Sequence, residues 1–324
     1  MYPLKFENLY FDKVWGARGL EKIRKNLPEG KIGESWDVSC HPHGMSVISN
    51  GEFKGMTLQK LIDKSAEKVI GKSILKDRFP LLVKLLNTSD KLSVQVHPND
   101  EYAKEKENEL GKTEVWYVVD AEVGAKLIVG TNGCTKEQFR DAIANGNPEE
   151  YMNVIEVKKG DTYLIKSGLV HSIGGGLLIA EIQQNSDTTY RVYDYNRGRE
   201  LHIEKALDVI DFALEGKKSE GLKLEKKGYS KTYLCLNDKF SLELYDINQS
   251  MKEKSDLERF YIFTCVDGEG EIEYKDGTET IRKGESILIP ACLGEYNISG
   301  NIKVLKSYVP DVEAVRKEIL NIVE

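Results

Sequence analysis

A short run of alternating polar residues is the first part of this chain that could form a chemical site. Ser93, Gln95 and His97 alternate with two valines, so a strand here turns the polar side chains to one face and the valines to the other. Burying such a face costs several kcal/mol unless each polar group finds a partner. Pro98 then ends the strand and leaves His97 at its rim.

Glu114 and His171 are candidates to complete a metal site with Gln95 and His97. Glu114 opens the next predicted strand after a charged segment, and His171 follows a turn at Gly168. A glutamine oxygen, two imidazoles and a carboxylate suit Zn²⁺ or another divalent first-row ion. Taken singly, each residue also fits a buried polar group with an ordinary hydrogen-bond partner. Together, on neighbouring strands of one sandwich, they favour a metal centre.

The other three histidines are predicted to lie at the surface. His41 and His43 form an HxH pair, but Pro42 and Gly44 indicate a turn that leaves both imidazoles in solvent. His202 stands at the start of a predicted helix, and we interpret it as a surface residue.

The elements that must position these residues are mostly strands. Short alternating apolar segments, separated by Gly, Asn or Asp, are typical of antiparallel strands in a sandwich or barrel. These segments are 91–97, 115–119, 125–129, 153–157, 161–165, 177–183, 239–247, 259–266, 270–274 and 286–289. Helices are predicted at 57–70, 135–144, 203–214 and 312–322, and the charge-rich residues 101–110 form a solvated helix or loop.

The length of 324 residues exceeds the size at which one hydrophobic core usually keeps growing, which predicts two domains. Residues 215–231 are polar and rich in lysine, and we interpret them as a linker. The expected domains are therefore 1–215, which holds the candidate metal residues, and 216–324.

An internal repeat also indicates two related units. Residues 157–172 (VKKGDTYLIKSGLVHS) and 281–296 (IRKGESILIPACLGEY) align without gaps, and each has a glycine turn before a short apolar strand. The position of His171 in the first copy holds Glu295 in the second, and residues 216–324 contain no histidine. The metal chemistry is therefore expected in the first unit.

The composition argues against several classes of function. The net charge is −7, which disfavours a general binder of nucleic acid or of anionic membranes. The five cysteines include no CxxC pair, which disfavours a cysteine-based metal or redox unit and fits a reducing compartment. The first residues lack an apolar leader, and no apolar run reaches the ~18 residues of a membrane span. We expect a cytoplasmic protein without nucleic-acid or membrane partners.

The candidate residues lie in blocks that make the chain resemble a known family. The blocks are WG at 15–16, GESWDVSCHPHG at 33–44, SVQVHPND at 93–100, GKTEVWYVV at 111–119, KSGLVHSIGGG at 166–176 and AEIQQNSDTTYRVYDYNR at 180–197. Over about the first two-thirds of its length, the chain resembles the type I mannose-6-phosphate isomerases, zinc enzymes of the cupin class, in their shorter bacterial form. The resemblance implies a mainly β fold of two cupin-like antiparallel β-sandwich (jelly-roll) domains with a few peripheral helices.

The resemblance also implies a reaction and the residues that carry it. The enzyme would interconvert mannose 6-phosphate and fructose 6-phosphate by proton transfer between C1 and C2. One Zn²⁺ per chain would be held by Gln95, His97, Glu114 and His171. Arg191 and Glu181 would be catalytic, and Ser93, Lys112 and Arg197 would contact substrate or phosphate. The partner would be a small hexose phosphate, and the chain would be a monomer or weak homodimer.

The base that transfers the proton stays open at this point. Glu181 shares a strand face with Ile179 and Gln183, which places a carboxylate near the metal if that face points inward. Arg191 would stabilise the enediolate, and Lys112 would hold the phosphate. Zinc-bound water and Lys112 are alternatives to Glu181 as the base.

Three other functions compete with this one. A cupin isomerase for another sugar or sugar phosphate would differ in its dependence on phosphate. A non-catalytic sugar-phosphate sensor would bind its ligand without turnover. A metal-dependent oxygenase would use two histidines and a carboxylate, and would leave Gln95 without a task.

Overall fold

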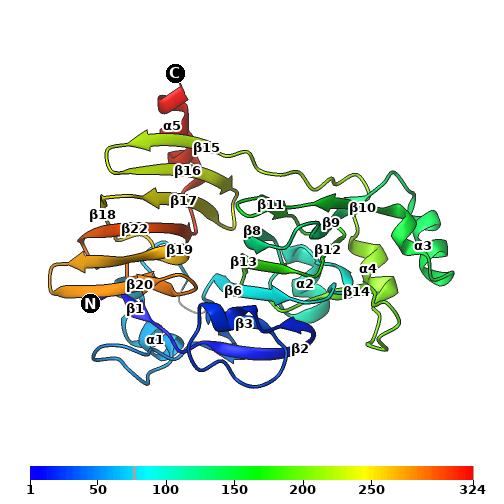
Figure 1. Cartoon of the computed structure of the whole chain (residues 1–324), viewed down its shortest axis with the longest axis horizontal. Coiled ribbons are helices and arrows are strands. Elements are labelled where there is room, and N and C mark those ends of the chain that lie inside the picture. Colours follow the sequence, from blue (N-terminus) through cyan, green and yellow to red (C-terminus); the bar gives the residue numbers. More distant parts are fainter. Residues whose placement is uncertain (76–77, 324) are drawn as a thin grey trace. The chain divides into compact units, whose positions relative to one another are not determined.

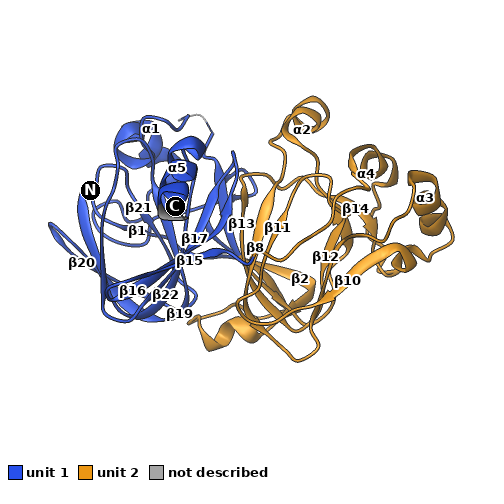
Figure 2. Cartoon of the chain, turned by 90° about the horizontal axis from the view of Figure 1, so that it is seen from above, with its two compact units in different colours: residues 1–9, 36–84, 220–324 blue, residues 10–35, 85–219 orange. Residues whose placement is uncertain are grey.

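The computed structural model describes residues 1–75 and 78–323 and is mainly β, as predicted (Figure 1). The chain forms two compact units (Figure 2). Unit 1 contains residues 1–9, 36–84 and 220–324, and unit 2 contains residues 10–35 and 85–219. The junction between Ser219 and Glu220 lies close to the expected boundary, but two N-terminal segments belong to the same unit as residues 220–324. The division into domains 1–215 and 216–324 stays a prediction.

Two antiparallel sheets form the framework of the candidate site. The five-stranded sheet has the order β10 (Met152–Glu156), β9 (Lys126–Thr131), β12 (His171–Ile173), β7 (Val94–Val96) and β14 (Tyr190–Tyr193). The six-stranded sheet has the order β11 (Thr162–Ile165), β8 (Glu114–Ala121), β13 (Leu177–Gln184), β6 (Leu81–Thr88), β2 (Leu9–Ala17) and β3 (Ile32–Val38).

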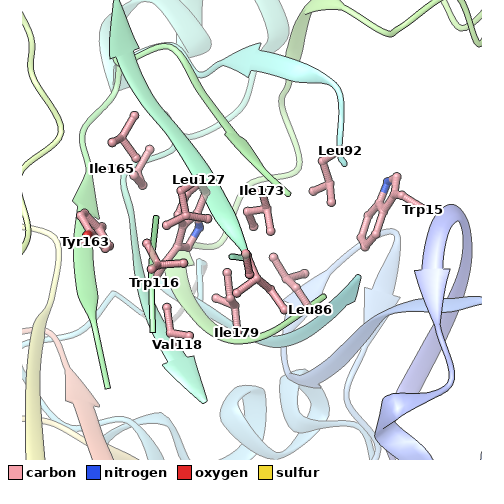
Figure 3. Close-up of a cluster of buried hydrophobic side chains, with 14 of the residues drawn as sticks. Trp15, Leu86, Leu92, Trp116, Val118, Leu127, Tyr163, Ile165, Ile173 and Ile179 are labelled. Carbon is pink, nitrogen blue, oxygen red and sulfur yellow. The ribbon is translucent and has the colours of Figure 1, made fainter. Parts of the chain in front are cut away.

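An apolar cluster joins the two sheets of unit 2 (Figure 3). Trp116 and Ile179 reach it from the six-stranded sheet, and Leu127 and Ile173 reach it from the five-stranded sheet. All four are almost completely buried. Their removal from water is the main force that holds the sheets face to face.

Short helices, two of them capped by side chains, accompany the strands of unit 2. They are α2 (Asp100–Glu107), α3 (Lys136–Ala144), α4 (Ile203–Val209), and the 3₁₀ turns at Gly19–Lys22 and Pro148–Tyr151. Asn99 caps α2, and Thr135 caps α3 in a capping box with Gln138. The charge-rich segment at 101–110 is therefore largely helical, whereas the helix expected at 203–214 ends at Val209.

Unit 1 is built on one large antiparallel sheet. Its strands run in the order β1 (Leu4–Lys5), β21 (Ser286–Ile289), β19 (Tyr261–Tyr274), β22 (Glu295–Tyr308), β17 (Ser241–Ile247), β16 (Tyr229–Leu236) and β15 (Leu222–Lys226), with β18 (Ser250–Lys254) on β22 and β20 (Gly277–Arg282) on β19. A small hairpin of β4 (Cys40–His41) and β5 (Gly44–Met45) and the helices α1 (Leu58–Val69) and α5 (Val312–Val323) complete the described elements.

The internal repeat has the same local structure in both copies. It places β11 in one copy and β21 in the other at matching positions. In the preceding turn, the backbone N–H of Lys158 donates to the Asp161 carboxylate at 3.0 Å. At the matching positions, the N–H of Arg282 donates to Glu285, also at 3.0 Å. The repeat predicted from the sequence is therefore a repeat of strand, turn and hydrogen bond.

Two predictions about unit 1 are wrong. The expected linker at 215–231 includes β15 and the start of β16, which pair as a hairpin at the edge of the sheet. Lysines on such an edge strand discourage further pairing, which explains the polar composition that looked like a linker. The strands expected at 259–266 and 270–274 form a single strand, β19, which continues past a register shift between Cys265 and Asp267.

The five helices of the described chain are all too short or too polar to cross a lipid bilayer.

Candidate metal centre

Three strands bring the predicted metal residues together within unit 2. His171 is the first residue of β12 and lies directly opposite Gln95 on β7. His97 follows immediately after the last residue of β7. Glu114 begins β8 in the other sheet. The site therefore lies where the ends of strands from the two sheets meet.

His97, Glu114 and His171 form one buried cluster. Their ligand atoms all lie within 4.8 Å of one another, and all three side chains have zero exposure. The Nε2 atoms of the two imidazoles are 3.1 Å apart. The Glu114 oxygens lie 3.5 Å from His97 Nε2 and 3.6 Å from His171 Nε2.

Backbone carbonyls fix the orientation of both imidazole rings. His97 Nδ1 lies 3.0 Å from the carbonyl oxygen of Thr188, and His171 Nδ1 lies 2.8 Å from that of Leu169. A carbonyl can only accept, so each Nδ1 carries the proton and each Nε2 presents a lone pair to the cluster. Metal-binding histidines are commonly held by this type of outer hydrogen bond.

The electrostatics of the cluster favour a cation over protons. Burial, followed by the charge of Lys112, lowers the pKa of His97 to about 3. Burial also lowers the pKa of His171. Burial alone would raise the pKa of Glu114, but Lys112 and the imidazoles outweigh it and hold this pKa well below its usual range. Two neutral imidazoles and a carboxylate are the protonation states that a metal requires.

Gln95 lies beside this cluster as the predicted fourth ligand. Its Nε2 atom is 3.3 Å from His171 Nε2. Metal binding through the amide oxygen requires the amide to turn by 180°, which exchanges two groups of nearly equal size.

The donor set fits a divalent metal. Both oxygens of Glu114 are buried and have no hydrogen-bond partner among the described residues. Buried carboxylate oxygens in this condition are costly unless a cation satisfies them. The structure therefore contains a site with the ligand types and the protonation that a divalent ion needs, formed by His97, Glu114 and His171.

Glu181 lies on β13, and Trp116 on the neighbouring strand holds its carboxylate. The indole Nε1 of Trp116 donates to Glu181 Oε1 at 3.0 Å, and both side chains are buried. The same indole packs edge-on against His171, with ring centroids 5.4 Å apart. Trp116 thus contacts both a predicted ligand and a predicted catalytic residue. This role of Trp116 was not predicted from the sequence, although Trp116 stands two positions after Glu114 and therefore on the same strand face.

Ser93, which immediately precedes β7, contacts Arg191 on the neighbouring strand β14. Arg191 lies opposite Gln95, and its Nε donates to Ser93 Oγ at 3.3 Å. A second nitrogen donates to the carbonyl oxygen of Glu200 at 2.7 Å. The guanidinium is thus oriented by two contacts on the sheet that carries Gln95.

Lys112 and Arg197 are two further cations of unit 2, with different surroundings. Lys112 is buried, and its Nζ lies 3.3 Å from Glu114 Oε2. Arg197 pairs through Nε with Asp194. Its two terminal nitrogens are buried without a hydrogen-bond acceptor in the described part of the chain, and the nearest recorded carboxylate, Asp90, lies 3.6 Å away. Lys112 therefore lies in the metal cluster. Among the described residues, no contact joins Arg197 to that cluster.

One prediction about the remaining histidines is wrong. His41 and His43 do flank a turn, between β4 and β5, but only His43 is exposed. His41 is 3% exposed because its ring packs against Trp36, and its Nδ1 accepts the backbone N–H of His43. His202 is partly exposed and precedes α4, where its Nδ1 accepts the N–H of Arg191.

Unit 1 has different side chains at the position that corresponds to Glu114 in the internal repeat. In unit 2, Ile165 of the repeat pairs with Glu114, whereas Ile289 of the second copy pairs with Tyr261. The Nζ of Lys306 lies 3.9 Å from the centroid of the Tyr261 ring. A phenol and an ammonium therefore occupy the place of the carboxylate. The described residues contain one candidate metal cluster, and it lies in unit 2.

Two family models match the chain. The catalytic domain of type I phosphomannose isomerase matches residues 4–127, and the cupin domain of mannose-6-phosphate isomerase matches residues 229–309. The first match includes Gln95, His97 and Glu114, and the second covers the part of the chain that lacks the metal residues.

Individual proteins match over nearly the full length. The mannose-6-phosphate isomerase ManA of Bacillus subtilis is 36% identical over 314 residues, covering 95% of this chain and 99% of that protein. The enzyme of Streptococcus mutans is 36% identical over 94% of this chain and 98% of its own length.

Solved structures match in the same way. The mannose 6-phosphate isomerase of Bacillus subtilis has a TM-score of 0.89 at 34% identity, covering 95% of this chain and 99% of its own. A variant of phosphomannose isomerase from Salmonella typhimurium, at 17% identity, has a TM-score of 0.76 over 95% of this chain and 100% of its own, which shows a shared fold.

Proposed function

This chain belongs to the type I mannose-6-phosphate isomerases, and from that membership we propose how its buried cluster serves the reaction. It is an aldose–ketose isomerase that interconverts mannose 6-phosphate and fructose 6-phosphate. The observation that carries the proposal is the convergence of His97, Glu114 and His171, with both Nε2 lone pairs directed toward a buried carboxylate whose oxygens have no hydrogen-bond partner among the described residues.

The proposed ligands of a resident Zn²⁺ are His97, Glu114, His171 and Gln95, the last through its amide oxygen. This set contains one carboxylate, so it leaves the bound ion with a net positive charge. The chemistry that Zn²⁺ supplies here is Lewis-acid polarisation of the sugar oxygens at C1 and C2.

The proton transfer is assigned to Glu181. Its carboxylate is buried on the face of the six-stranded sheet to which Glu114 of β8 also points, and the Trp116 N–H holds one oxygen in place. A carboxylate held in this way can accept the proton from one carbon and return it to the next. Arg191, oriented by Ser93, stabilises the negative charge of the enediolate.

The phosphate is assigned to Lys112 and Arg197. The two terminal nitrogens of Arg197 lack hydrogen-bond acceptors in the described chain, and a phosphate oxygen would supply them. Anchoring the phosphate away from the reacting carbons provides binding energy that positions C1 and C2. The proposal also includes a cytoplasmic location, a monomer or weak homodimer, and a domain 216–324 without its own metal.

Substrate dependence tests this function. Purified protein with Zn²⁺ should convert mannose 6-phosphate to fructose 6-phosphate and should turn over free mannose far more slowly. Arg197→Ala should raise KM for the phosphorylated sugar and leave the slow reaction of free mannose unchanged. Equal turnover of both sugars would indicate an isomerase for another substrate. Tight binding of mannose 6-phosphate without turnover would indicate a sensor.

A further inference from the structure

Gln183 is a buried side chain that the reaction described above does not use. It lies on β13 directly opposite Glu114 on β8, and it has zero exposure. Residues directly opposite in an antiparallel pair point to the same face, with Cβ atoms about 5 Å apart. Because Glu114 points into the metal cluster, Gln183 lies on the face that forms the reaction site.

Backbone contacts fix which way the Gln183 amide points. Its Nε2 donates to the carbonyl oxygens of Gln184 at 2.9 Å and Ser186 at 2.6 Å. Carbonyls can only accept, so the nitrogen must stay on their side and the oxygen must point away from them. Oε1 is then buried with no hydrogen-bond donor among the described residues.

The protein donors of the cluster are already engaged. The imidazole Nδ1 atoms of His97 and His171 face backbone carbonyls, and the ammonium of Lys112 pairs with Glu114. A buried acceptor without a donor costs roughly 1–3 kcal/mol, so such atoms usually have a partner that the protein alone does not show. A hydroxyl group of the bound substrate can supply the missing donor.

Resting on the function proposed above, we propose that Gln183 Oε1 accepts a hydrogen bond from the C3 or C4 hydroxyl of the bound hexose phosphate. The oxygens on C1 and C2 belong to the isomerisation, and the phosphate occupies C6. In the pyranose form of the sugar the C5 oxygen closes the ring, so the C3 and C4 hydroxyls are the donors left to recognise. Gln183 then determines specificity, because its fixed oxygen accepts a hydrogen bond from a sugar that carries the hydroxyl. With a sugar that lacks the hydroxyl, the same oxygen stays buried and unpaired, which weakens binding.

The test compares mannose 6-phosphate with its 3-deoxy and 4-deoxy analogues, in which C1 and C2 are intact. In the wild-type chain, kcat/KM for one analogue should fall about tenfold, the expected effect of one hydrogen bond. In Gln183→Met this penalty should disappear, while the metal content stays at one ion per chain.

Gln184 provides a matched control on the opposite face of the strand. Its amide accepts the N–H of Thr113 and donates to Asp100, so both ends have partners in the protein. Gln184→Met should lower thermal stability and leave the wild-type preference between the sugars unchanged. A penalty that persists in Gln183→Met, or a wild-type chain indifferent to both deoxy sugars, would overturn the proposal. A wild-type chain that does not isomerise mannose 6-phosphate would overturn the proposed function as well.

Discussion

The Nε2 atoms of His97 and His171 face each other across 3.1 Å, and both rings are oriented by backbone carbonyls at Nδ1. Two lone pairs at this distance repel unless a cation or a proton lies beside them. Burial lowers the pKa of both imidazoles, which disfavours the proton. The pair is therefore organised for a metal ion.

Removing one imidazole should remove the metal. In His171→Ala, bound zinc should fall from one ion per chain to near zero, as measured by elemental analysis after dialysis. Activity should fall by about 100-fold or more, because Lewis-acid stabilisation is worth several kcal/mol.

His43→Ala is the matched control, because His43 is exposed and lies in unit 1, outside the cluster. It should keep both metal and activity. A His171→Ala protein that retains one tightly bound zinc would show that the ion binds elsewhere.

Trp116→Phe should reduce catalysis without removing the metal. A phenyl ring still packs against His171, but Glu181 loses the indole N–H that holds its carboxylate. We expect kcat to fall about tenfold, since one buried hydrogen bond to a charged group contributes about 1.5–3 kcal/mol. Steady-state kinetics and zinc content measured on the same preparation check this.

Trp15→Phe is the control for Trp116→Phe, because Trp15 is buried in the same apolar cluster. It should cost stability and leave kcat near the wild-type value. Equal effects of the two substitutions on kcat would contradict a positioning role for Trp116.

Solvent hydrogen should enter the sugar during turnover. An enediol formed by Glu181 exposes the transferred proton to exchange, because a carboxylate can trade its proton with water before returning it. In tritiated water, product and recovered substrate should both carry label at the exchanging carbon. Complete absence of label at every pH and extent of reaction would indicate a direct hydride shift between the carbons.

Unit 1 should lose stability in acid through Glu253. Burial raises the pKa of this carboxyl, but Lys306 and the phenols of Tyr245 and Tyr296 outweigh burial and lower it. A lowered pKa in the folded state means stability that is complete above the unfolded value of about 4.3 and is lost as the pH falls through the folded value. Glu253→Gln should therefore destabilise at pH 7, and the difference from wild type should shrink below about pH 4.

Denaturant unfolding of Glu253→Gln at pH 7 and at pH 3.5 measures this effect. Glu7→Gln, at an exposed position of the same unit, is the control and should change little at either pH. A deficit of equal size at both pH values would show that Glu253 acts through packing alone.

The strands, and the convergence of His97, Glu114 and His171, could be predicted because their patterns are local. Alternation along 177–183 and the apolar run at 286–289 mark both segments as strands, and β13 and β21 agree with these ranges closely. The spacing of Gln95 and His97 places both on one face of a strand, which is how they reach the cluster. The two copies of the internal repeat share even a single turn hydrogen bond, because the repeated sequence specifies a turn and the strand that follows it.

The features that were missed depend on which side chains and strands pack together, which composition and spacing alone do not reveal. His41 is buried because Trp36 covers it, which no pattern around the HxH pair reveals. The hairpin of β15 and β16 looked like a linker because an edge strand can be as polar as a loop. Likewise, the contact of Trp116 with Glu181 depends on the pairing of β8 with β13, and that register became visible only in the structure.

Reversible metal removal tests the central claim most directly. The protein should be stripped of metal with a chelator, assayed on mannose 6-phosphate, and titrated with Zn²⁺ while bound metal and activity are followed together. We expect no turnover without metal and a linear recovery that stops at one ion per chain. Full activity in the metal-free protein, or recovery that requires more than one ion, would contradict a reaction centred on His97, Glu114 and His171.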